Sequence, residues 1–277
     1  MQALGIDIGG TGMKAAPVDV ATGTLLADRK KILTPKPATP KAVAEVVREL
    51  TEAFGWTGIT GATFPGVVTE GTIRSAANLD KSWIGTDAAA LFGKVTGGDV
   101  AVLNDADAAG VAEMTFGAGK GDRRTVLMLT FGTGIGSALF NGGLLVPNTE
   151  FGHIEIRGKD AESRASERGK TEHGWGWKEW AQRVDEYMQH IEALLSPDLI
   201  VIGGGISKEC EKWVPMLTNV RAEIVPAALL NDAGIVGAAM AAAGMAATGT
   251  HTARTDTTVP PGTGETVTSR SGTATGR

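Results

Sequence analysis

Short apolar runs alternate along this chain with segments of helical periodicity. Two extended runs, residues 3–8 and 13–20, flank a glycine-rich turn and predict a strand–turn–strand unit. After Thr39 and Pro40, which suit an N-cap and a first helical position, apolar residues recur at helical spacing as far as Phe54. Further strands are expected at 59–64, 100–103, 126–130, 137–140, 199–202 and 224–227, and further helices after residue 104, at 177–195, from residue 207 and at 232–245. Strands that alternate with helices indicate an α/β architecture.

The first glycine turn has a counterpart later in the chain. Residues 5–12 resemble residues 129–134, and each segment places a glycine turn after a predicted strand. If the two halves of the fold face each other, the two turns lie on opposite walls of one cleft. The repeat therefore predicts a ligand site between two similar halves.

Length and composition add a domain count and a tail. A chain of 277 residues suggests two domains, at roughly 150 residues each. Apolar residues make up 42% and charged residues 21%, which allows an ordinary core without covalent cross-links. Residues 247–277 are almost entirely Thr, Gly, Ser, Pro and Ala, with scattered charges. Such a segment buries too little apolar surface to offset its ordering entropy, so we expect a disordered tail.

Charge and cysteine content exclude several classes of protein. A net charge of −5 argues against non-specific nucleic-acid binding. The single cysteine, Cys210, excludes an internal disulfide and a multi-cysteine zinc site. The apolar stretch 234–247 is too short to span a bilayer, and the N-terminus lacks the features of a signal peptide. We therefore expect a cytoplasmic enzyme or binding protein with no membrane partner.

Three glycine-rich turns follow apolar strands, at residues 9–12, 132–136 and 203–205. Glycine lets the backbone approach a ligand closely and aim its N–H groups at phosphate oxygens, although a tight hairpin alone also needs glycine. Thr11 and Thr133 add hydroxyl donors, and Lys14 adds a positive charge. The turn at 203–205 lacks the third glycine of a dinucleotide fingerprint, and no Walker-A pattern is present. Together the turns predict a nucleotide or polyphosphate site.

Two aspartates stand near strand ends. Asp7 precedes the first turn and suits a hydrated Mg²⁺, or it stabilises the turn. Asp105 stands where a strand becomes a helix, so it is either an N-cap or a general base aimed into the cleft, with Asn104 beside it to bind a hydroxyl. Asp107 is the competing candidate for the cap.

Glu150 and His153 are three residues apart and combine a carboxylate with an imidazole. Such a pair binds vicinal hydroxyls of a sugar, or it is simply a satisfied, partly buried pair. No second histidine lies at ligand spacing, so a zinc site is not expected.

Motifs along most of the chain resemble those of the ROK family of sugar kinases, which has the actin-like (ribonuclease-H-like) two-domain fold. The resemblance is stronger still to its actinobacterial members that use polyphosphate, the polyphosphate glucokinases and the polyphosphate/ATP glucomannokinases. It extends from about residue 4 to residue 245 and leaves out the tail. The matching stretches are GIDIGGTGMK, LTPKPATP, FPGVV, AANLDKSWIGT, LNDADAAGVAE, LTFGTGIGSAL, PNTEFGHIEI, PDLIVIGGGIS and VPAALLNDAGIVGAAM.

The resemblance implies roles for individual residues. It makes Asp105 the catalytic base, in contact with the substrate, and Asp7 a ligand of Mg²⁺ through water. The implied phosphate motifs are Asp7, Gly9, Gly10, Thr11, Gly12 and Lys14, then Thr130, Gly132, Thr133 and Gly134, with Gly203, Gly204 and Gly205 on the adenosine side. The implied sugar contacts are Gly66, Asn78, Asn104, Glu150, His153 and Glu162. The cysteine-rich zinc motif of many ROK proteins is missing, so the resemblance does not imply zinc.

The implied activity is phosphorylation of the 6-hydroxyl of glucose, and of mannose, by polyphosphate or ATP, in a homodimer. The implied domains are residues 1–104 with 232–246 and residues 105–231, separated by the cleft. A polyphosphate chain extends past the transferred group, so we expect a basic track that begins at Lys14. Candidate outer contacts are Lys81 and one of the clusters Lys120, Arg123 and Arg124 or Arg164 and Lys170, all of which could equally be solvated surface.

Three alternatives remain from the sequence. A strictly ATP-dependent glucokinase of the same family would share every motif. A non-catalytic sugar-sensing module would be expected to lack the base, yet Asp105 is present. A sugar-responsive repressor would need a DNA-binding module before the first strand, which begins at residue 3, so this class is not expected.

Overall fold

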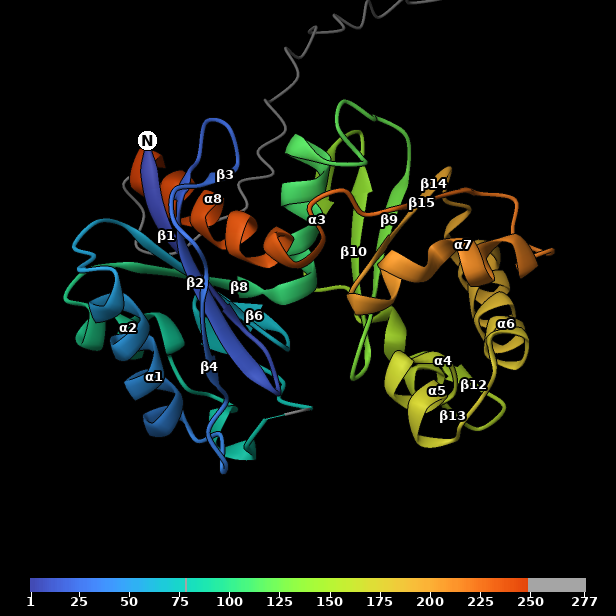
Figure 1. Cartoon of the computed structure of the whole chain (residues 1–277), viewed down its shortest axis with the longest axis horizontal. Helices are drawn as coiled ribbons and strands as arrows, with labels where there is room; N and C mark the ends of the chain where they lie inside the picture. Colours follow the sequence, from blue (N-terminus) through green and yellow to red (C-terminus); the bar gives the residue numbers. More distant parts are fainter. Residues whose placement is uncertain (78, 249–277) are drawn as a thin grey trace, which may run out of the picture.

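The two large β-sheets lie in opposite halves of the molecule (Figure 1). The structure is a computed structural model that describes residues 1–77 and 79–248. The first sheet has the order β3-β2-β1-β5-β8, with β4 also paired to β2, and the second has the order β11-β10-β9-β14-β15. The strands of the first sheet are β1 (Gln2–Ile8), β2 (Gly12–Asp19), β3 (Thr24–Leu25), β4 (Lys30–Leu33), β5 (Thr60–Phe64) and β8 (Val100–Asn104). Those of the second are β9 (Val126–Phe131), β10 (Ile135–Asn141), β11 (Leu144–Val146), β14 (Leu199–Gly203) and β15 (Glu223–Pro226).

The two sheets share one topology. In each, an antiparallel hairpin (β1/β2 or β9/β10) is followed by two parallel strands. The order β2-β1-β5-β8 therefore matches β10-β9-β14-β15, and the glycine turn joins the hairpin strands in both. The weak sequence repeat thus reflects two similar halves, as predicted.

Helices α1 (Pro40–Ala53) and α2 (Ala88–Thr96) cover one face of the first sheet. Thr39 caps α1, since its side chain accepts a hydrogen bond from the Ala42 N–H at 3.3 Å, and Pro40 takes the first turn as expected. Val43, Val47 and Leu50 on the buried side of α1 enter the core of the first sheet. The helical periodicity of this segment therefore predicts the helix and its buried face correctly.

Helices α3 (Asp105–Phe116) and α8 (Ala233–Thr248) pack against each other where the two halves meet (Figure 1). Their contact is close because glycine replaces a side chain: a Cβ at Gly237 would lie 1.9 Å from the Ala108 carbonyl oxygen. A Cβ at Gly61 would likewise lie 1.8 Å from the Ala238 carbonyl oxygen, so α8 also lies directly on β5. Helix α8 thus brings the chain back to the first sheet. The expected division into domains at residue 104 remains a prediction.

One helical segment among the described residues, 230–248, is long and apolar enough to cross a membrane. This corrects the expectation from the stretch 234–247, because the helical segment has 19 residues. Half of it is buried inside the protein, against β1, β5 and α3. Its apolar composition therefore serves the core.

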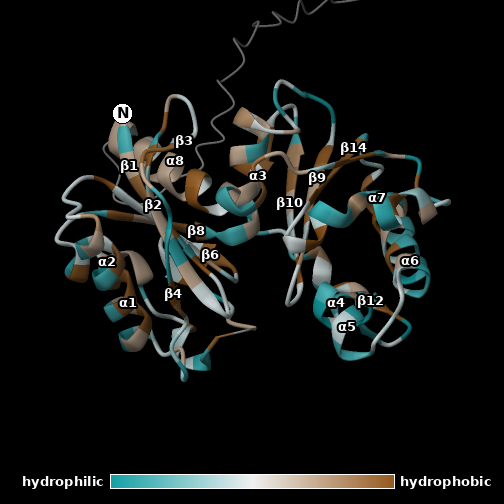
Figure 2. Ribbon diagram, in the orientation of Figure 1, coloured by the Kyte–Doolittle hydropathy of each residue, from teal (hydrophilic) through white to brown (hydrophobic). Residues whose placement is uncertain are grey.

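The second sheet packs on helix α6 (Trp177–Leu195), and aromatic side chains from both meet in the core between them. Phe131 of β9 makes edge-to-face contacts with Trp180, Tyr187 and Trp213 at centroid distances of 5.9–6.5 Å. In Figure 2 the strands β9 and β14 are largely brown, whereas α6 shows teal on its outer side. The predicted amphipathic helix is confirmed over its full length.

Several elements differ from the expectation. A 3-10 helix (Gly205–Glu209) precedes α7 (Cys210–Trp213), where one helix was expected from residue 207. The expected tail begins within α8, which includes residues 247 and 248, and the rest of it lies outside the described residues. The elements that periodicity missed are short: β3, β4, β11, α2, β6 (Val68–Thr69), β7 (Thr72–Ile73), β12 (Glu155–Ile156), β13 (Lys159–Asp160), α4 (Ala161–Ala165) and α5 (Glu167–Glu172). Only a few residues of each show a pattern, which is too few to reveal a period.

Candidate active site

A cavity of about 270 Å³ lies between the two halves and is lined by both hairpin turns. The first half contributes Gly9, Gly10, Thr11, Pro65, Gly66, Ser75, Ala77, Asn104 and Asp105. The second contributes residues 130–137, Thr149, Glu150, His153, Glu162, Gly204 and Gly205. The structure therefore brings together most of the residues that the sequence singled out. Asp7 and Lys14 line an adjoining cavity of about 150 Å³, which shares Asp105, Thr130 and Gly204 with the first.

Asp105 is the first residue of α3 and directly follows strand β8. Asn104, and not Asp105 or Asp107, is the N-cap: its Oδ1 accepts a hydrogen bond from the Asp107 N–H at 2.9 Å. Asn104 Nδ2 also donates to the Gly66 carbonyl at 3.1 Å. The cap therefore lies one residue before Asp105, because Asn104 ends the strand in an extended conformation and the helix begins at Asp105. Asp105 is thus free of the capping role and faces the cavity.

Burial raises the pKa of Asp105 to about 7, and the negative charge of Asp7 adds to the shift. The Ala106 N–H, which donates to Asp105 Oδ1 at 2.8 Å, partly opposes it. A general base is most effective when its pKa lies near the operating pH. The carboxylate of Asp105 therefore has the position and the basicity that a proton acceptor in this cavity needs.

Asp7 is held by the two strands beside it. Thr63 of β5 donates from Oγ1 to Asp7 Oδ1 at 3.1 Å and accepts from the Ile8 N–H at 2.9 Å. Lys14 lies directly opposite Asp7 in the β1/β2 pair, and its Nζ is 3.4 Å from Asp7 Oδ2. The positive charge expected at Lys14 is therefore paired with Asp7, and Thr63 is a supporting residue that no motif indicated.

The second and third glycine turns meet at one point. Gly204 has φ +83°, and a Cβ there would lie 2.1 Å from the Phe131 carbonyl oxygen, so only glycine fits. Gly204 and Gly205 reach the cavity, whereas Gly203 ends β14 behind them. Gly12 also does not line the cavity; its carbonyl closes the first turn by accepting the Gly9 N–H at 3.2 Å.

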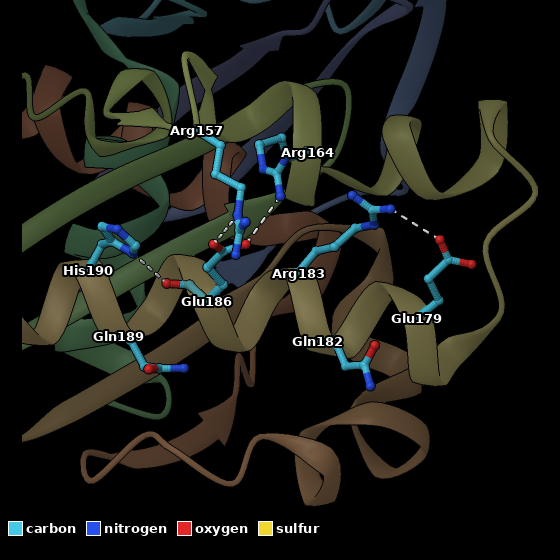
Figure 3. Close-up of a pocket in the computed structure, with 8 residues that line it drawn as sticks. All are labelled: Arg157, Arg164, Glu179, Gln182, Arg183, Glu186, Gln189 and His190. Atoms are coloured by element: carbon cyan, nitrogen blue, oxygen red, sulfur yellow. Dashed lines mark hydrogen bonds and ion pairs between the residues drawn. The ribbon is translucent and has the colours of Figure 1, made fainter.

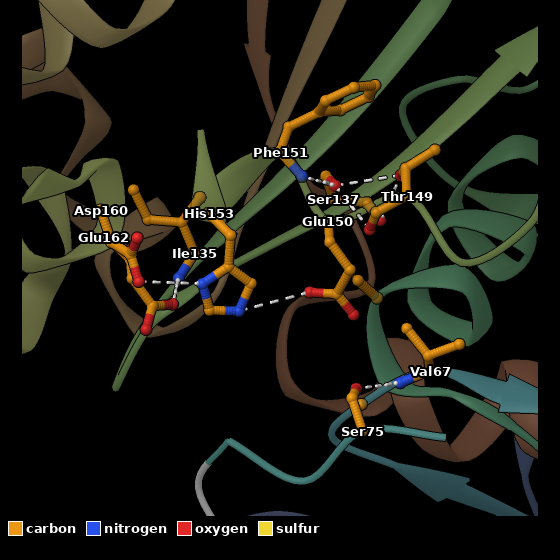
Figure 4. Close-up of polar contacts among 12 residues, drawn as sticks. Val67, Ser75, Ile135, Ser137, Thr149, Glu150, Phe151, His153, Asp160 and Glu162 are labelled. Atoms are coloured by element: carbon orange, nitrogen blue, oxygen red, sulfur yellow. Dashed lines mark hydrogen bonds and ion pairs between the residues drawn. The ribbon is translucent and has the colours of Figure 1, made fainter. Parts of the chain in front are cut away.

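His153 lies between the carboxylates of Glu150 and Asp160 beside the cleft (Figure 4). His153 Nε2 is 3.7 Å from Glu150 Oε2, and His153 Nδ1 is 3.4 Å from Asp160 Oδ2. Glu162 accepts from the Ile135 N–H at 3.2 Å, which fixes it beside the second glycine turn. Burial raises the pKa of Glu150, and the nearby charge of Glu162 contributes in the same direction. Oxygen acceptors and an imidazole thus converge in a form suited to binding several hydroxyls.

Side chains that the sequence did not indicate hold this wall in place. Ser137 Oγ donates to the Thr149 carbonyl at 2.9 Å and accepts from the Phe151 N–H at 3.1 Å, on either side of Glu150. Asn148, with φ +59°, pairs its side chain with both the N–H and the carbonyl of Val68, each at 2.9 Å. The Asn148 N–H in turn donates to Asp107 Oδ2 at 2.7 Å. Asp107 is therefore a support for the loop that carries Glu150, and not a cap.

We expect Glu150→Gln and His153→Ala each to raise the Michaelis constant for the sugar by about 5- to 100-fold, because each leaves a hydroxyl without its partner. The Michaelis constant for the phosphoryl donor should stay within about twofold, since neither residue lies in a glycine turn. Steady-state kinetics with each substrate varied in turn provides the measurement. A loss of donor affinity with intact sugar affinity would contradict this placement.

The expected outer contacts of a basic track do not line the cleft. Lys120, Arg123 and Arg124 precede β9, whereas the cleft turn follows it, and a six-residue strand spans roughly 20 Å. Arg124 is also paired with Asp122 at 2.7 Å. Lys81 donates to the Ala76 carbonyl at 2.7 Å, which ties it to the backbone beside Ser75 and Ala77 of the cleft.

Arg164 and Lys170 face a different surface. Arg164 donates to Glu186 at 3.1 Å and lines a groove of about 830 Å³ along α6 (Figure 3). Arg157 of the same groove also donates to Glu186, at 2.6 Å, so the charges that line the groove are largely balanced. Lys170 Nζ lies 4.3 Å from the Trp177 ring centroid. None of these cations reaches the cavity between the sheets.

The carboxylates of the cleft suit a hydrated Mg²⁺ ion better than a metal that needs several protein ligands. Among residues 1–77 and 79–248, no three His, Cys, Asp or Glu side chains gather as metal ligands. Asp7 and Asp105 do line the same small cavity, and Mg²⁺ is commonly held by one or two carboxylates together with substrate phosphates and water. The donor set therefore fits a hydrated Mg²⁺. The predicted sugar contact Asn78 lies outside the described residues.

A two-lobed α/β fold of matching halves, with glycine turns on both walls of the cleft and an aspartate between them, is the actin-like architecture of sugar kinases. The chain belongs to the ROK family, whose model matches residues 3–174. It is 56% identical over 238 residues to the polyphosphate glucokinase of Mycobacterium tuberculosis, covering 86% of this chain and 89% of that relative. The expected family and fold are thus confirmed.

Two solved structures extend the comparison. The inorganic polyphosphate/ATP-glucomannokinase from Arthrobacter sp. strain KM is 48% identical, with a TM-score of 0.85 over 87% of this chain and 98% of that one. A ROK family glucokinase from Streptomyces griseus, solved with glucose and AMPPNP, is 24% identical, with a TM-score of 0.74 over 86% and 98% of the two chains. The second likeness shows the fold alone.

Proposed function

We propose that this protein is a kinase that transfers a phosphoryl group to the 6-hydroxyl of glucose, with inorganic polyphosphate as donor and ATP as an alternative. The observation that carries the proposal is the position of Asp105, a half-buried carboxylate between two glycine turns and next to a wall of hydroxyl-binding groups. The names of the 56% and 48% identical relatives support the choice of donor and of sugar.

The reaction needs one proton acceptor and a rigid cradle for phosphate. Asp105 takes the proton of the sugar 6-hydroxyl while the oxygen of that hydroxyl forms the new bond to phosphorus. The bond from that phosphorus to the bridging oxygen of the donor breaks, which leaves a polyphosphate shorter by one unit, or ADP. A positioned base contributes about 10²–10⁴ in rate, and the rest comes from orientation and charge neutralisation.

The remaining residues hold the reactants. Backbone N–H groups of Gly10 and Thr11 in the first turn, and of Thr133 and Gly134 in the second, bind donor phosphates, and the two threonines add hydroxyls. Glu150, His153, Glu162, Asn104 and Gly66 bind sugar hydroxyls. Asp7 would hold Mg²⁺ through water, and the ion would neutralise donor charge when bound. We also propose mannose as a second acceptor, a cytoplasmic location and a homodimer.

The donor assignment is tested in a coupled glucose 6-phosphate assay with long-chain polyphosphate or ATP at several salt concentrations. We expect turnover with both donors and a steeper rise of the Michaelis constant with salt for polyphosphate, whose binding rests on many screened charges. Turnover with ATP alone would contradict the proposed donor and favour an ATP-dependent glucokinase. Mannose in place of glucose tests the second acceptor in the same assay.

A further inference from the structure

Two lysines face each other across neighbouring strands beside the first glycine turn. In the antiparallel β2/β4 pair, Lys14 is directly opposite Lys31, and Gly12 is opposite Leu33. Met13 and Ile32 alternate with them and pack into the core of the first sheet, so Lys14 and Lys31 share the other face. Asp7 lies on this same face, since it is opposite Lys14 in the β1/β2 pair.

The stem of Lys31 lies across Gly12. A Cβ at Gly12 would be 2.7 Å from Lys31 Cε and 3.6 Å from Lys31 Nζ, so the missing side chain makes room for this lysine. The ammonium group is thereby delivered to the end of the phosphate turn. Thr34, which directly follows β4, anchors the strand there by donating from its hydroxyl to the Gly9 carbonyl at 2.5 Å.

The charges at this point are not balanced. Asp7 pairs with Lys14, whereas Lys31 is exposed and makes no ion pair within residues 1–77 and 79–248. Like charges directly opposite each other on neighbouring strands destabilise a sheet. An anion bound across the two ammonium groups would remove that cost. Lys14 lines the small cavity that also contains Asp105, so such an anion would extend outward from the reaction centre.

We propose that Lys14 and Lys31 form the binding site for the part of the polyphosphate chain that extends beyond the transferred phosphate. This inference rests on the proposed function. The site lies on the first half of the protein, whereas the turn with Gly204 and Gly205, on the proposed nucleoside side, lies on the second. The reacting phosphates of polyphosphate and ATP therefore occupy the same position, and the remaining parts of the two donors extend from it in different directions. Lys31 is thus proposed as the outer contact of the polyphosphate chain, in place of the residues expected from the sequence, which were Lys81, Lys120, Arg123, Arg124, Arg164 and Lys170.

The chain offers a matched control in Lys30. It carries the same charge one residue away, but it is opposite Ala15 on the other face of the sheet. Lys31→Ala should raise the Michaelis constant for long-chain polyphosphate by at least about threefold, while Lys30→Ala stays within about twofold of wild type. The Michaelis constant for ATP should change little in either variant, and Lys31→Arg should restore polyphosphate affinity.

A binding measurement without glucose separates this proposal from the proposed function. Long-chain polyphosphate alone should raise the melting temperature of the wild type and of Lys30→Ala more than that of Lys31→Ala. Equal effects of the two alanine variants, or equal effects of Lys31→Ala on polyphosphate and ATP, would overturn the Lys31 site and leave the proposed kinase intact. Absence of both polyphosphate binding and polyphosphate turnover in the wild type would overturn both.

Discussion

Asp105→Asn should lower the turnover number at least about 10²-fold, because the amide cannot accept the proton of the sugar hydroxyl. The fold should be retained. Asn104 caps α3, and the amide oxygen of the substituted side chain can still accept from the Ala106 N–H. The measurement is steady-state turnover with either donor, together with thermal unfolding. Near-normal turnover in this variant would show that Asp105 is not the base.

The pH dependence of the wild type is a control for this assignment. Burial raises the pKa of Asp105 to about 7, so its basic form is lost as the pH falls through 7 and turnover should fall with it. The same shift favours folding with the carboxyl protonated, and this contribution is lost as the pH rises from the ordinary value of 3.8 through 7. Asn does not ionise, so the variant should be at least as stable as the wild type at pH 8. A lower melting temperature of the variant at pH 8 would contradict the burial argument.

Gly237→Ala should destabilise the protein by about 2 kcal/mol or more, although alanine is the better helix former by about 1 kcal/mol. The new methyl group would lie 1.9 Å from the Ala108 carbonyl oxygen, and its neighbours are backbone atoms of α3 that have no rotamer to change. Helices α3 and α8 would have to move apart, which also shifts Asp105 at the start of α3. Denaturant unfolding measures the loss.

Gly244→Ala, in the same helix α8, is the matched control. A Cβ at Gly244 has no heavy atom within 4 Å, so only helix propensity acts there. This variant should gain up to about 1 kcal/mol of stability. If both substitutions stabilise the protein, the close packing of α8 on α3 is wrong.

Periodicity was sufficient for the long elements. Helices α1 and α6 each present a buried stripe over several turns, and strands β9 and β14 are almost entirely apolar. Each of these signals is repeated over many residues, so no distant partner is needed to recognise it. Short elements such as β4 are different, because their strand conformation comes from the hydrogen bonds of a partner strand.

The candidate residues of the site could also be recognised from local sequence patterns. Glycine turns after apolar strands, and Asp105 at the junction of a strand and a helix, are local patterns that the sequence displays directly. The resemblance to ROK proteins then supplied the roles. Which residue caps α3 could not be read from these patterns, because Asn104, Asp105 and Asp107 all have side chains able to cap and only backbone geometry separates them.

By itself, the sequence determined the fold class and the family, and it indicated the candidate side chains of the site. Only the tertiary structure decided which charges are available to a ligand. Lys81, Arg124 and Arg164 are paired with other groups of the protein, whereas β4 brings Lys31 beside Gly12 and opposite Lys14. The physical reason is that a charge acts over a few ångströms through space, and the register of β2 with β4 places together residues that are 17 positions apart in the chain.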